Sequence, residues 1–544
     1  MVYIHLNNKL TKPKEEKDMR KGLLKKLLAV AIATTCVVSS FGCGGTSDGS
    51  SGGNATYKDT INIAVAQEAA TLDIAKQGGL IAKQIVNGTI YEKLLTLNSK
   101  GEPTPELCES YTVSDDATEF TFILRKGVKF HDGSVMTADD VIASMNRWIE
   151  GYSAAKQLAG TSRFEKVDES TVRIKLASSN ITFPYALAGS TQMAIITKAS
   201  ECSKEDSAGY LVNTIGTGPY KLDKWELGQY ITISKFDDYI PYGDSSKEID
   251  GMAGYKNGYI KTINFYYVPD ESTRVAGLQT GQYDFIYNVT SDDYNMISSV
   301  PGFTTFKDEA GTLTALFNKK QGIGTDQYFR QAVITALDME KVLKSTYGDF
   351  YSLGSSYMDA AQGTWVNDVG SASYNQKNTA KAKELLAKSS YKGETVRLLT
   401  SNINGYPNGA EIIRQQLESI GIKVDVQIVE FATYSALSQD PTAYDIGMVS
   451  YSSVPIPSQK VYITSTYRGW ASDEKLADML SKFNSATTID TAKNEWKDIQ
   501  EYCYEYVPVI HFGHYQLACG YSTKVSGVVF YNANPYFWNA KVAQ

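Results

Sequence analysis

The segment 395–429 constrains the fold more than any other part of the sequence. It reads as an alternating strand, TVRLLTS, a helix, AEIIRQQLESI, a glycine at position 421 and a second alternating strand, IKVDVQIV. Glycine is suited to the left-handed backbone conformation that ends many helices. Strand, helix and strand at this spacing make a βαβ crossover, which joins parallel strands. The segment therefore predicts an α/β fold.

Periodic patterns elsewhere predict the same mixture of elements. Alternation of apolar and polar residues predicts strands at 61–65, 119–130, 171–176, 230–236 and 261–268. Apolar residues at helical spacing predict helices at 137–149, 328–337 and about 473–506. Thr137 is typical of a helix N-cap. Because 544 residues exceed the size at which a single core stops growing, we expect two or more lobes.

Charge and residue usage exclude some classes of function. The formal net charge of −7 argues against a nucleic-acid-binding protein, which usually has a basic surface. The chain has 37 Tyr but only 4 His. Tyrosine rings suit ligand pockets, although ordinary strand positions account for many of them. The few histidines, and the absence of a CxxC motif, argue against a metal bound directly by side chains, and we predict no cofactor.

Residues 19–42 have the order of charges and apolar residues of a secretory signal. A basic start is followed by a short apolar run and then by small residues up to Cys43, although Ser40 stands where lipoprotein signals usually have Leu. We expect a bacterial lipoprotein, lipid-anchored at Cys43 on the outside of the cell membrane; a plain secreted protein is the alternative. Residues 1–18 read as an extension before the natural start at Met19, and 43–56 as a Gly/Ser tether.

The remaining cysteines do not make a disulfide framework. Four thiols are spread over the mature chain, at positions 108, 202, 503 and 519. Disulfide-stabilised domains are small and have many closely spaced cysteines, which is not the pattern here. A single bridge, such as one between Cys503 and Cys519, stays open at this point.

Several motifs occur in a fixed order along the chain. The region 91–148 contains YEKLL, a Pro-x-Leu before SYTVSDD, LRKGVKFHDG and TADDV, and it is followed by GTGPYKLDKW, FRQAVITALD, AYDIGM and VPVIHF. From about residue 60 to the end, the sequence resembles the family-5 extracellular solute-binding proteins, the peptide- and nickel-binding group of ABC importers.

The resemblance implies a two-lobe, periplasmic-binding-protein-like (type II) α/β fold with a subdomain inserted in the first lobe. We expect a first lobe made of 57–103, 213–312 and 507–544, an inserted subdomain at 104–212 and a second lobe at 313–506. Such a protein captures a solute between closing lobes and delivers it to a membrane permease, which works with an ATPase subunit. It is expected to be monomeric, to bind no nucleic acid and to have no enzymatic activity.

The resemblance also places the ligand-binding residues. In peptide-binding relatives, an acidic residue after a second-lobe strand pairs with the free amino group of the peptide. The matching stretch, 448–462, contains no Asp or Glu, and none occurs between 446 and 472. The residues expected to contact ligand are Gln192, Asn404, Tyr406, Ser450, Tyr451, Tyr467, Arg468 and Trp470. Arg468 can pair with a ligand carboxylate, or it can be an ordinary surface arginine; Tyr406 and Trp470 can equally serve to pack loops together.

Alternative functions follow from what the motifs leave open. We expect a di- or oligopeptide ligand, with an opine-like compound, a glycoside or a metal chelate as alternatives, and a peptide-sensing receptor as a further one. The sequence has no GxSxG, HExxH or P-loop, so an enzyme is the least favoured class. His511 and His514 lie three residues apart on a predicted strand, and we expect them to point to opposite faces and not to share a metal.

Overall fold

The computed structural model describes residues 56–77, 79–190, 192–403 and 405–544. The predicted signal peptide, the lipidation residue Cys43 and the predicted ligand residue Asn404 lie outside these residues. The names first lobe, inserted subdomain and second lobe are kept below for the predicted ranges.

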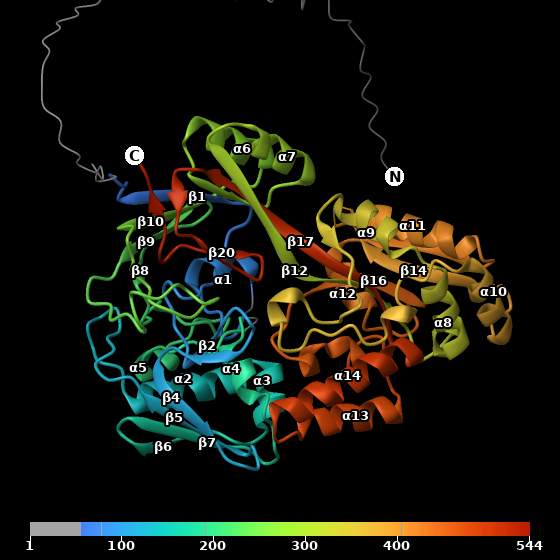
Figure 1. Cartoon of the computed structure of the whole chain (residues 1–544), viewed down its shortest axis with the longest axis horizontal. Helices are drawn as coiled ribbons and strands as arrows, with labels where there is room; N and C mark the ends of the chain where they lie inside the picture. Colours follow the sequence, from blue (N-terminus) through green and yellow to red (C-terminus); the bar gives the residue numbers. More distant parts are fainter. Residues whose placement is uncertain (1–55, 78, 191, 404) are drawn as a thin grey trace, which may run out of the picture. The chain divides into compact units, whose positions relative to one another are not determined.

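One mixed sheet of 11 strands runs through the first and second lobes (Figure 1). Its strands, in spatial order, are β15 (Lys423–Val429), β14 (Thr395–Ser401), β16 (Ile446–Ser452), β12 (Phe303–Phe317), β17 (Val509–Ser522), β11 (Phe285–Tyr287), β1 (Thr60–Val65), β10 (Thr262–Tyr267), β9 (Tyr230–Lys235) and β8 (Tyr220–Glu226), with β13 (Tyr351–Ser352) paired to β17. The antiparallel pair β12 and β17 is the longest, with 15 and 14 residues, and joins the strands of the two lobes.

The predicted βαβ unit is confirmed. Strands β14 and β15 pair in parallel, with the helix α11 (Tyr406–Glu418) between them in sequence. Gly421 has a φ of +97°, so the glycine predicted at the end of the helix does adopt a left-handed conformation. Strand β14 also pairs in parallel with β16, which places the carboxyl ends of three parallel strands at one edge of the sheet.

The inserted subdomain has its own four-stranded antiparallel sheet, in the order β4 (Cys108–Val113), β5 (Glu119–Leu124), β7 (Thr171–Lys175), β6 (Phe164–Asp168). Its helices are α2 (Ala138–Gly151), α3 (Ser153–Ala159), α4 (Phe183–Ala188) and α5 (Ala199–Cys202). Helix α2 begins as predicted at Thr137, which forms a reciprocal capping box with Asp140. The strand predicted at 119–130 ends at Leu124, since a bend with Gly127 at a φ of +75° follows.

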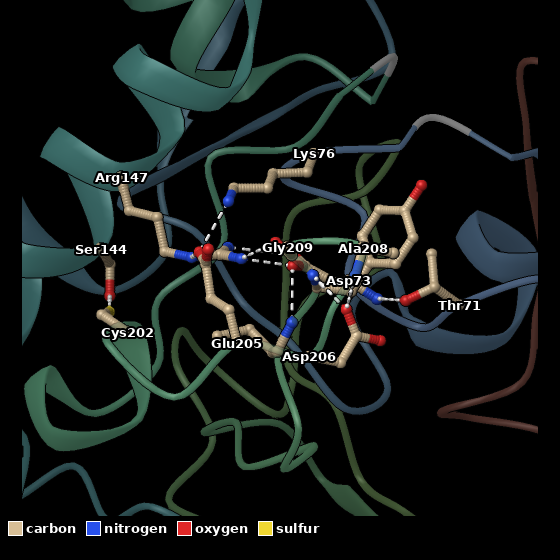
Figure 2. A network of polar contacts seen from close by, with 12 residues as sticks. Thr71, Asp73, Lys76, Ser144, Arg147, Cys202, Glu205, Asp206, Ala208 and Gly209 are labelled. Carbon is tan, nitrogen blue, oxygen red and sulfur yellow. Dashed lines mark hydrogen bonds and ion pairs between the residues drawn. The ribbon is translucent and has the colours of Figure 1, made fainter.

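A buried network of charges ties the inserted subdomain to the first lobe (Figure 2). Arg147 on α2 donates from Nη1 to Oδ1 of Asp73 at 3.1 Å, and the Asp73 side chain is fully buried. Glu205 accepts from both Arg147 and Lys76, at 3.0 and 2.6 Å. Removing one partner of such a buried pair typically costs about 3–5 kcal/mol, so this network fixes the subdomain on its lobe.

The remaining helices and short strands complete the fold. The other helices are α1 (Leu80–Val86), α6 (Glu271–Thr280), α7 (Ser291–Ser299), α8 (Gln327–Ala336), α9 (Met339–Tyr347), α10 (Thr379–Lys388), α12 (Phe431–Leu437), α13 (Glu474–Asn484) and α14 (Ile489–Tyr506). Short strands are β2 (Leu95–Leu97), β3 (Pro103–Pro105), β18 (Val525–Ser526), β19 (Val529–Tyr531), β20 (Asn534–Tyr536) and β21 (Lys541–Val542), and short 3-10 helices are η1 (Ile323–Thr325), η2 (Ala360–Gln362), η3 (Ser371–Ser373), η4 (Pro457–Gln459) and η5 (Val461–Ile463).

The single helix predicted at about 473–506 is wrong, because two helices occupy this range. Helix α13 ends at Asn484, and Thr488 begins α14 by accepting a hydrogen bond from the Thr491 backbone at 3.1 Å. The side-chain oxygen of Thr488 is thus a local signal for the break.

Two further observations concern thiols and membranes. The cysteines at 108, 202, 503 and 519 are all free, so the bridge left open between Cys503 and Cys519 is absent from the described part of the chain. In residues 56–77, 79–190, 192–403 and 405–544, none of the helices combines the length and the apolar character that a bilayer crossing requires.

Candidate ligand-binding site

The carboxyl ends of β14, β15 and β16 define the first candidate position, because open α/β sheets bind ligands outside the carboxyl ends of their parallel strands. Two predicted residues meet at this edge. Tyr406, in the first turn of α11, and Ser450, near the end of β16, are joined by a hydrogen bond between their hydroxyls. The Ser450 backbone also donates to the Tyr406 hydroxyl at 3.2 Å. These contacts fix the start of α11 to the end of β16.

Three more predicted residues form a second group at the same edge. The Tyr467 ring lies 6.1 Å from the Tyr451 ring. Arg468 donates from Nε to the Tyr467 hydroxyl at 2.9 Å and from Nη1 to the Ser438 hydroxyl at 2.6 Å. Its guanidinium lies over the rings of Tyr467 and Tyr434, at 5.0 and 5.8 Å from their centroids. We call Tyr434, Tyr451, Tyr467 and Arg468 the Arg468 group.

The electrostatics of the Arg468 group favour an anion. Arg468 is half-buried and its side-chain hydrogen bonds go to neutral hydroxyls; no carboxylate among the described residues pairs with it. Burial raises the pKa of Tyr451 well above its ordinary value, so this side chain remains a neutral donor. The hydroxyls of Tyr434 and Tyr451 are buried and have no partner within the described residues. A guanidinium beside free hydroxyl donors can hold a carboxylate through charge-assisted hydrogen bonds.

The side chains of two predicted residues make no hydrogen bond to this group within the described part of the chain, although the Trp470 backbone donates to the Tyr467 carbonyl at 2.9 Å. The Trp470 ring stacks on Tyr444, with centroids 6.3 Å apart, and the Lys320 ammonium lies 5.4 Å from its centroid. Gln192 donates to the Lys76 carbonyl at 2.6 Å, and its own carbonyl accepts from the Trp148 indole at 2.9 Å. Trp470 therefore packs against the second lobe, and Gln192 is held between the first lobe and the inserted subdomain.

A cluster of buried charges next to the end of β16 was missed by the sequence reasoning. Asp359 accepts from His514 on β17 at 2.9 Å and lies 3.6 Å from the Lys460 ammonium. Glu309, on β12, accepts from the Ala360 backbone at 2.9 Å. Burial alone would raise the pKa of Asp359, but Lys460 and His514 outweigh it and hold this pKa below its ordinary value. These residues come from four distant segments, and no local motif connects them.

The expectation that His511 and His514 point to opposite faces is wrong. Their rings are 5.4 Å apart, and His511 is hydrogen-bonded to the Gly354 carbonyl at 2.8 Å. The register of β12 against β17 shifts between His511 and Gly513, and Gly513 has a φ of +134°. The extra residue of this bulge changes the alternation of side chains, so both histidines lie on one side.

The same cluster contains the residues that could hold a metal ion. Glu309, Asp359 and His514 each offer a ligand atom, and these atoms lie within 4.8 Å of one another. The Lys460 ammonium, however, lies beside the Asp359 carboxylate and would repel a divalent cation. We therefore interpret the cluster as an ion network that supports the end of β16.

The fold and the site together define a class of protein. Two sheet-containing lobes are connected through the long strands β12 and β17. Near the carboxyl edge of its parallel strands, the second lobe presents among tyrosines an arginine that pairs with no carboxylate of the described residues. These are features of a protein that binds a small solute.

The comparison with known families then identifies the family. Residues 102–473 match the model for "Bacterial extracellular solute-binding proteins, family 5 Middle", which covers more than half of the chain. The chain belongs to this family of bacterial extracellular solute-binding proteins.

Individual relatives are similar over most of their length. The probable peptide ABC transporter periplasmic-binding protein y4tO of Sinorhizobium fredii is 26% identical over 477 residues, which cover 84% of this chain and 88% of the relative. The oligopeptide-binding protein AppA of Bacillus subtilis is 27% identical over 403 residues, covering 69% and 70%. Among solved structures, AgaA of A. tumefaciens R10 in complex with agropinic acid has a TM-score of 0.71 and 25% identity, covering 89% of this chain and 99% of AgaA.

Proposed function

We propose that the chain is the solute-binding subunit of an ABC importer and that it captures a short peptide whose carboxylate binds Arg468. The observation that carries the carboxylate assignment is the half-buried guanidinium of Arg468, which has hydroxyl partners only among the described residues. Desolvating a guanidinium without an anion is unfavourable, and a ligand carboxylate supplies that anion. The family and the names of the relatives y4tO and AppA support a peptide.

The proposed mechanism follows from the position of the group. A solute that touches the second lobe through Arg468 and the first lobe through other contacts has a higher affinity for closed lobes than for open ones. Such a difference in affinity is what allows a ligand to shift the equilibrium toward closure. The closed protein would then deliver its solute to the permease, and the ATPase subunit would supply the energy.

A second candidate is a carboxylate-bearing solute without a free ammonium group, such as an opine-like compound. The specific observation in its favour is that residues 446–472 contain no Asp or Glu to pair with an ammonium. The likeness to AgaA, whose structure holds agropinic acid, supports the same candidate. Both candidates share the carboxylate on Arg468 and differ in the rest of the solute.

We propose further that the protein acts outside the cell membrane, anchored by lipid at Cys43, and that it catalyses no reaction. The basic and apolar pattern of 19–42, the cysteine that follows and the extracellular family support this location. Radiolabelled palmitate incorporation into the chain, and its loss in Cys43→Ser, tests the anchor.

The carboxylate assignment is tested by comparing paired ligands. Di- to pentapeptides with a free carboxyl terminus and the same peptides with a terminal amide are titrated into wild type, Arg468→Met and the control Arg173→Met, which changes an exposed arginine of the inserted subdomain. Truncating one partner of a buried charge pair costs about 2–5 kcal/mol. We therefore expect Arg468→Met to bind the carboxylate peptides roughly 30-fold more weakly or worse, and to bind them no more tightly than the amides. Equal affinity of wild type for carboxylate and amide would contradict the proposal.

A further inference from the structure

A cavity of about 500 Å³ lies between the inserted subdomain and the second lobe. Helix α3 and residues 178–180 form one wall, and residues 458, 459, 461 and 463–465 together with α13 form the other, as the neighbouring positions of α3 and α13 in Figure 1 illustrate. Next to it, the Ile181 backbone donates to the Ala486 carbonyl at 3.3 Å. The inserted subdomain and the second lobe thus both line the cavity, and a direct contact between them closes it at one side.

The lining has an unusual composition for this chain. Its 18 described residues include no Asp, Glu, Lys, Arg or His and no aromatic residue, whereas 21% of the whole sequence is charged. Eleven lining residues are Ser, Thr, Asn or Gln and the others are aliphatic. An ionised ligand group would have no opposite charge to pair with here, and its desolvation would be unfavourable. The cavity therefore selects against charged groups.

Three polar atoms of the second-lobe wall are buried without a partner among the described residues: Ser458 Oγ, Gln459 Oε1 and Asn484 Oδ1. Gln459 as a whole is only 9% exposed. Two of the atoms are amide oxygens, which accept hydrogen bonds and cannot donate. A ligand group that reaches the two amide oxygens pairs with them only if it is a donor, and the uncharged lining favours a neutral donor such as a hydroxyl or an amide N–H.

The cavity is separate from the Arg468 group. Tyr462 and Tyr467 pack their rings against Tyr451, at 5.0 and 6.1 Å, on the side of the Arg468 group. Val461, Ile463 and their neighbours 464, 465 and 471 line the cavity instead. The segment 461–471 thus presents different residues to the Arg468 group and to the cavity.

We infer that this cavity is a second binding site, for an uncharged molecule or group rich in hydroxyl or amide N–H donors. A ligand held there would contact α3 and residues 178–180 on one side and Gln459 and Asn484 on the other. It would therefore stabilise the contact between the inserted subdomain and the second lobe. This site goes beyond the proposed function, because it neither needs Arg468 nor accepts a carboxylate.

The test uses the mature chain and neutral probes from the two sources of such donors. Sucrose and maltose supply hydroxyls, and N-acetyl-dialanine amide supplies amide N–H groups without a charge; dialanine with free termini is the charged comparison. Binding is measured by calorimetry for wild type, for Gln459→Met and Asn484→Leu, which remove the acceptor oxygens at similar volume, and for Asn295→Leu, which changes an exposed helical Asn elsewhere. Ala477→Phe, at an exposed position of the lining, narrows the cavity without altering a buried residue.

We expect at least one class of neutral probe to bind wild type and Asn295→Leu with equal affinity. Gln459→Met, Asn484→Leu and Ala477→Phe should each lower this affinity about tenfold, because the donors of the probe are left unpaired or are displaced. The stronger class shows whether hydroxyl or amide donors are preferred. No binding of any neutral probe to wild type, or binding that all three cavity variants leave unchanged, would overturn the inference. Arg468→Met separates the two proposals: it should leave the neutral probes unaffected whether or not it weakens carboxylate peptides.

Discussion

Arg468 and Asp359 are buried charges in opposite situations. Asp359 is fully buried, lies 3.6 Å from the Lys460 ammonium and is hydrogen-bonded to the His514 ring at 2.9 Å, all within the protein. Arg468 has hydroxyl partners, and no carboxylate of the described residues compensates its charge. A charge with an opposite charge beside it supports structure, whereas a charge without one is available to a ligand. This difference is why the two residues are assigned different roles.

His511 gives a prediction at the same scale. Burial lowers its pKa to about 3, against about 6.5 in an unfolded chain, so unfolding takes up a proton between these values. Stability from this residue is therefore complete above pH 6.5 and falls as the pH drops toward 3, by about 1.4 kcal/mol per pH unit. Chemical denaturation from pH 7 to pH 4.5 should give a flatter profile for His511→Gln than for wild type; parallel profiles would show that His511 does not titrate in this way.

At the scale of helices and strands, elements that depend on local patterns could be predicted from the sequence, whereas those that depend on distant contacts could not. The βαβ unit and the start of α2 could be predicted, because the signals for them lie within the segments themselves. These signals are the alternation of apolar and polar residues, the glycine at the end of the helix and the Thr137 cap. The early end of β5 and the break before α14 depend on single turn residues that periodicity averages over. The bulge at Gly513 could not be found from β17 alone, because a register shift is a property of its pairing with β12.

The bulge itself leads to a prediction. A Cβ at position 513 would lie 2.7 Å from the Ser352 carbonyl, at a φ of +134° that side chains rarely adopt. Gly513→Ala should therefore reduce the free energy of unfolding by more than Gly228→Ala, whose φ is also positive at +72° but whose added Cβ meets nothing within 4 Å. Thermal or denaturant unfolding measures both. Equal losses of about 1 kcal/mol, the cost of the backbone conformation alone, would show that the bulge tolerates a side chain.

At the scale of the whole molecule, the ordered motifs predicted the family and the α/β class, whereas the ligand-binding residues stay a prediction. Tyr406, Ser450, Tyr451, Tyr467 and Arg468 gather near the carboxyl edge of the second-lobe strands, and their contact with ligand stays a prediction. Their partners Tyr434 and Ser438, and the Asp359 cluster, come from other segments and only meet in three dimensions. Motifs in the sequence could not predict these residues, because they meet only through contacts between segments that are distant in sequence.

Native mass spectrometry of gently purified protein tests the central claim most directly, because it identifies the solute that the chain captures. Wild type and Arg468→Met are prepared in parallel from the same host, and any retained molecule is released and identified. The account predicts a peptide or peptide-like solute that bears a free carboxylate, retained by wild type and lost from Arg468→Met. A solute without an anionic group, or one that both proteins retain equally, would contradict it.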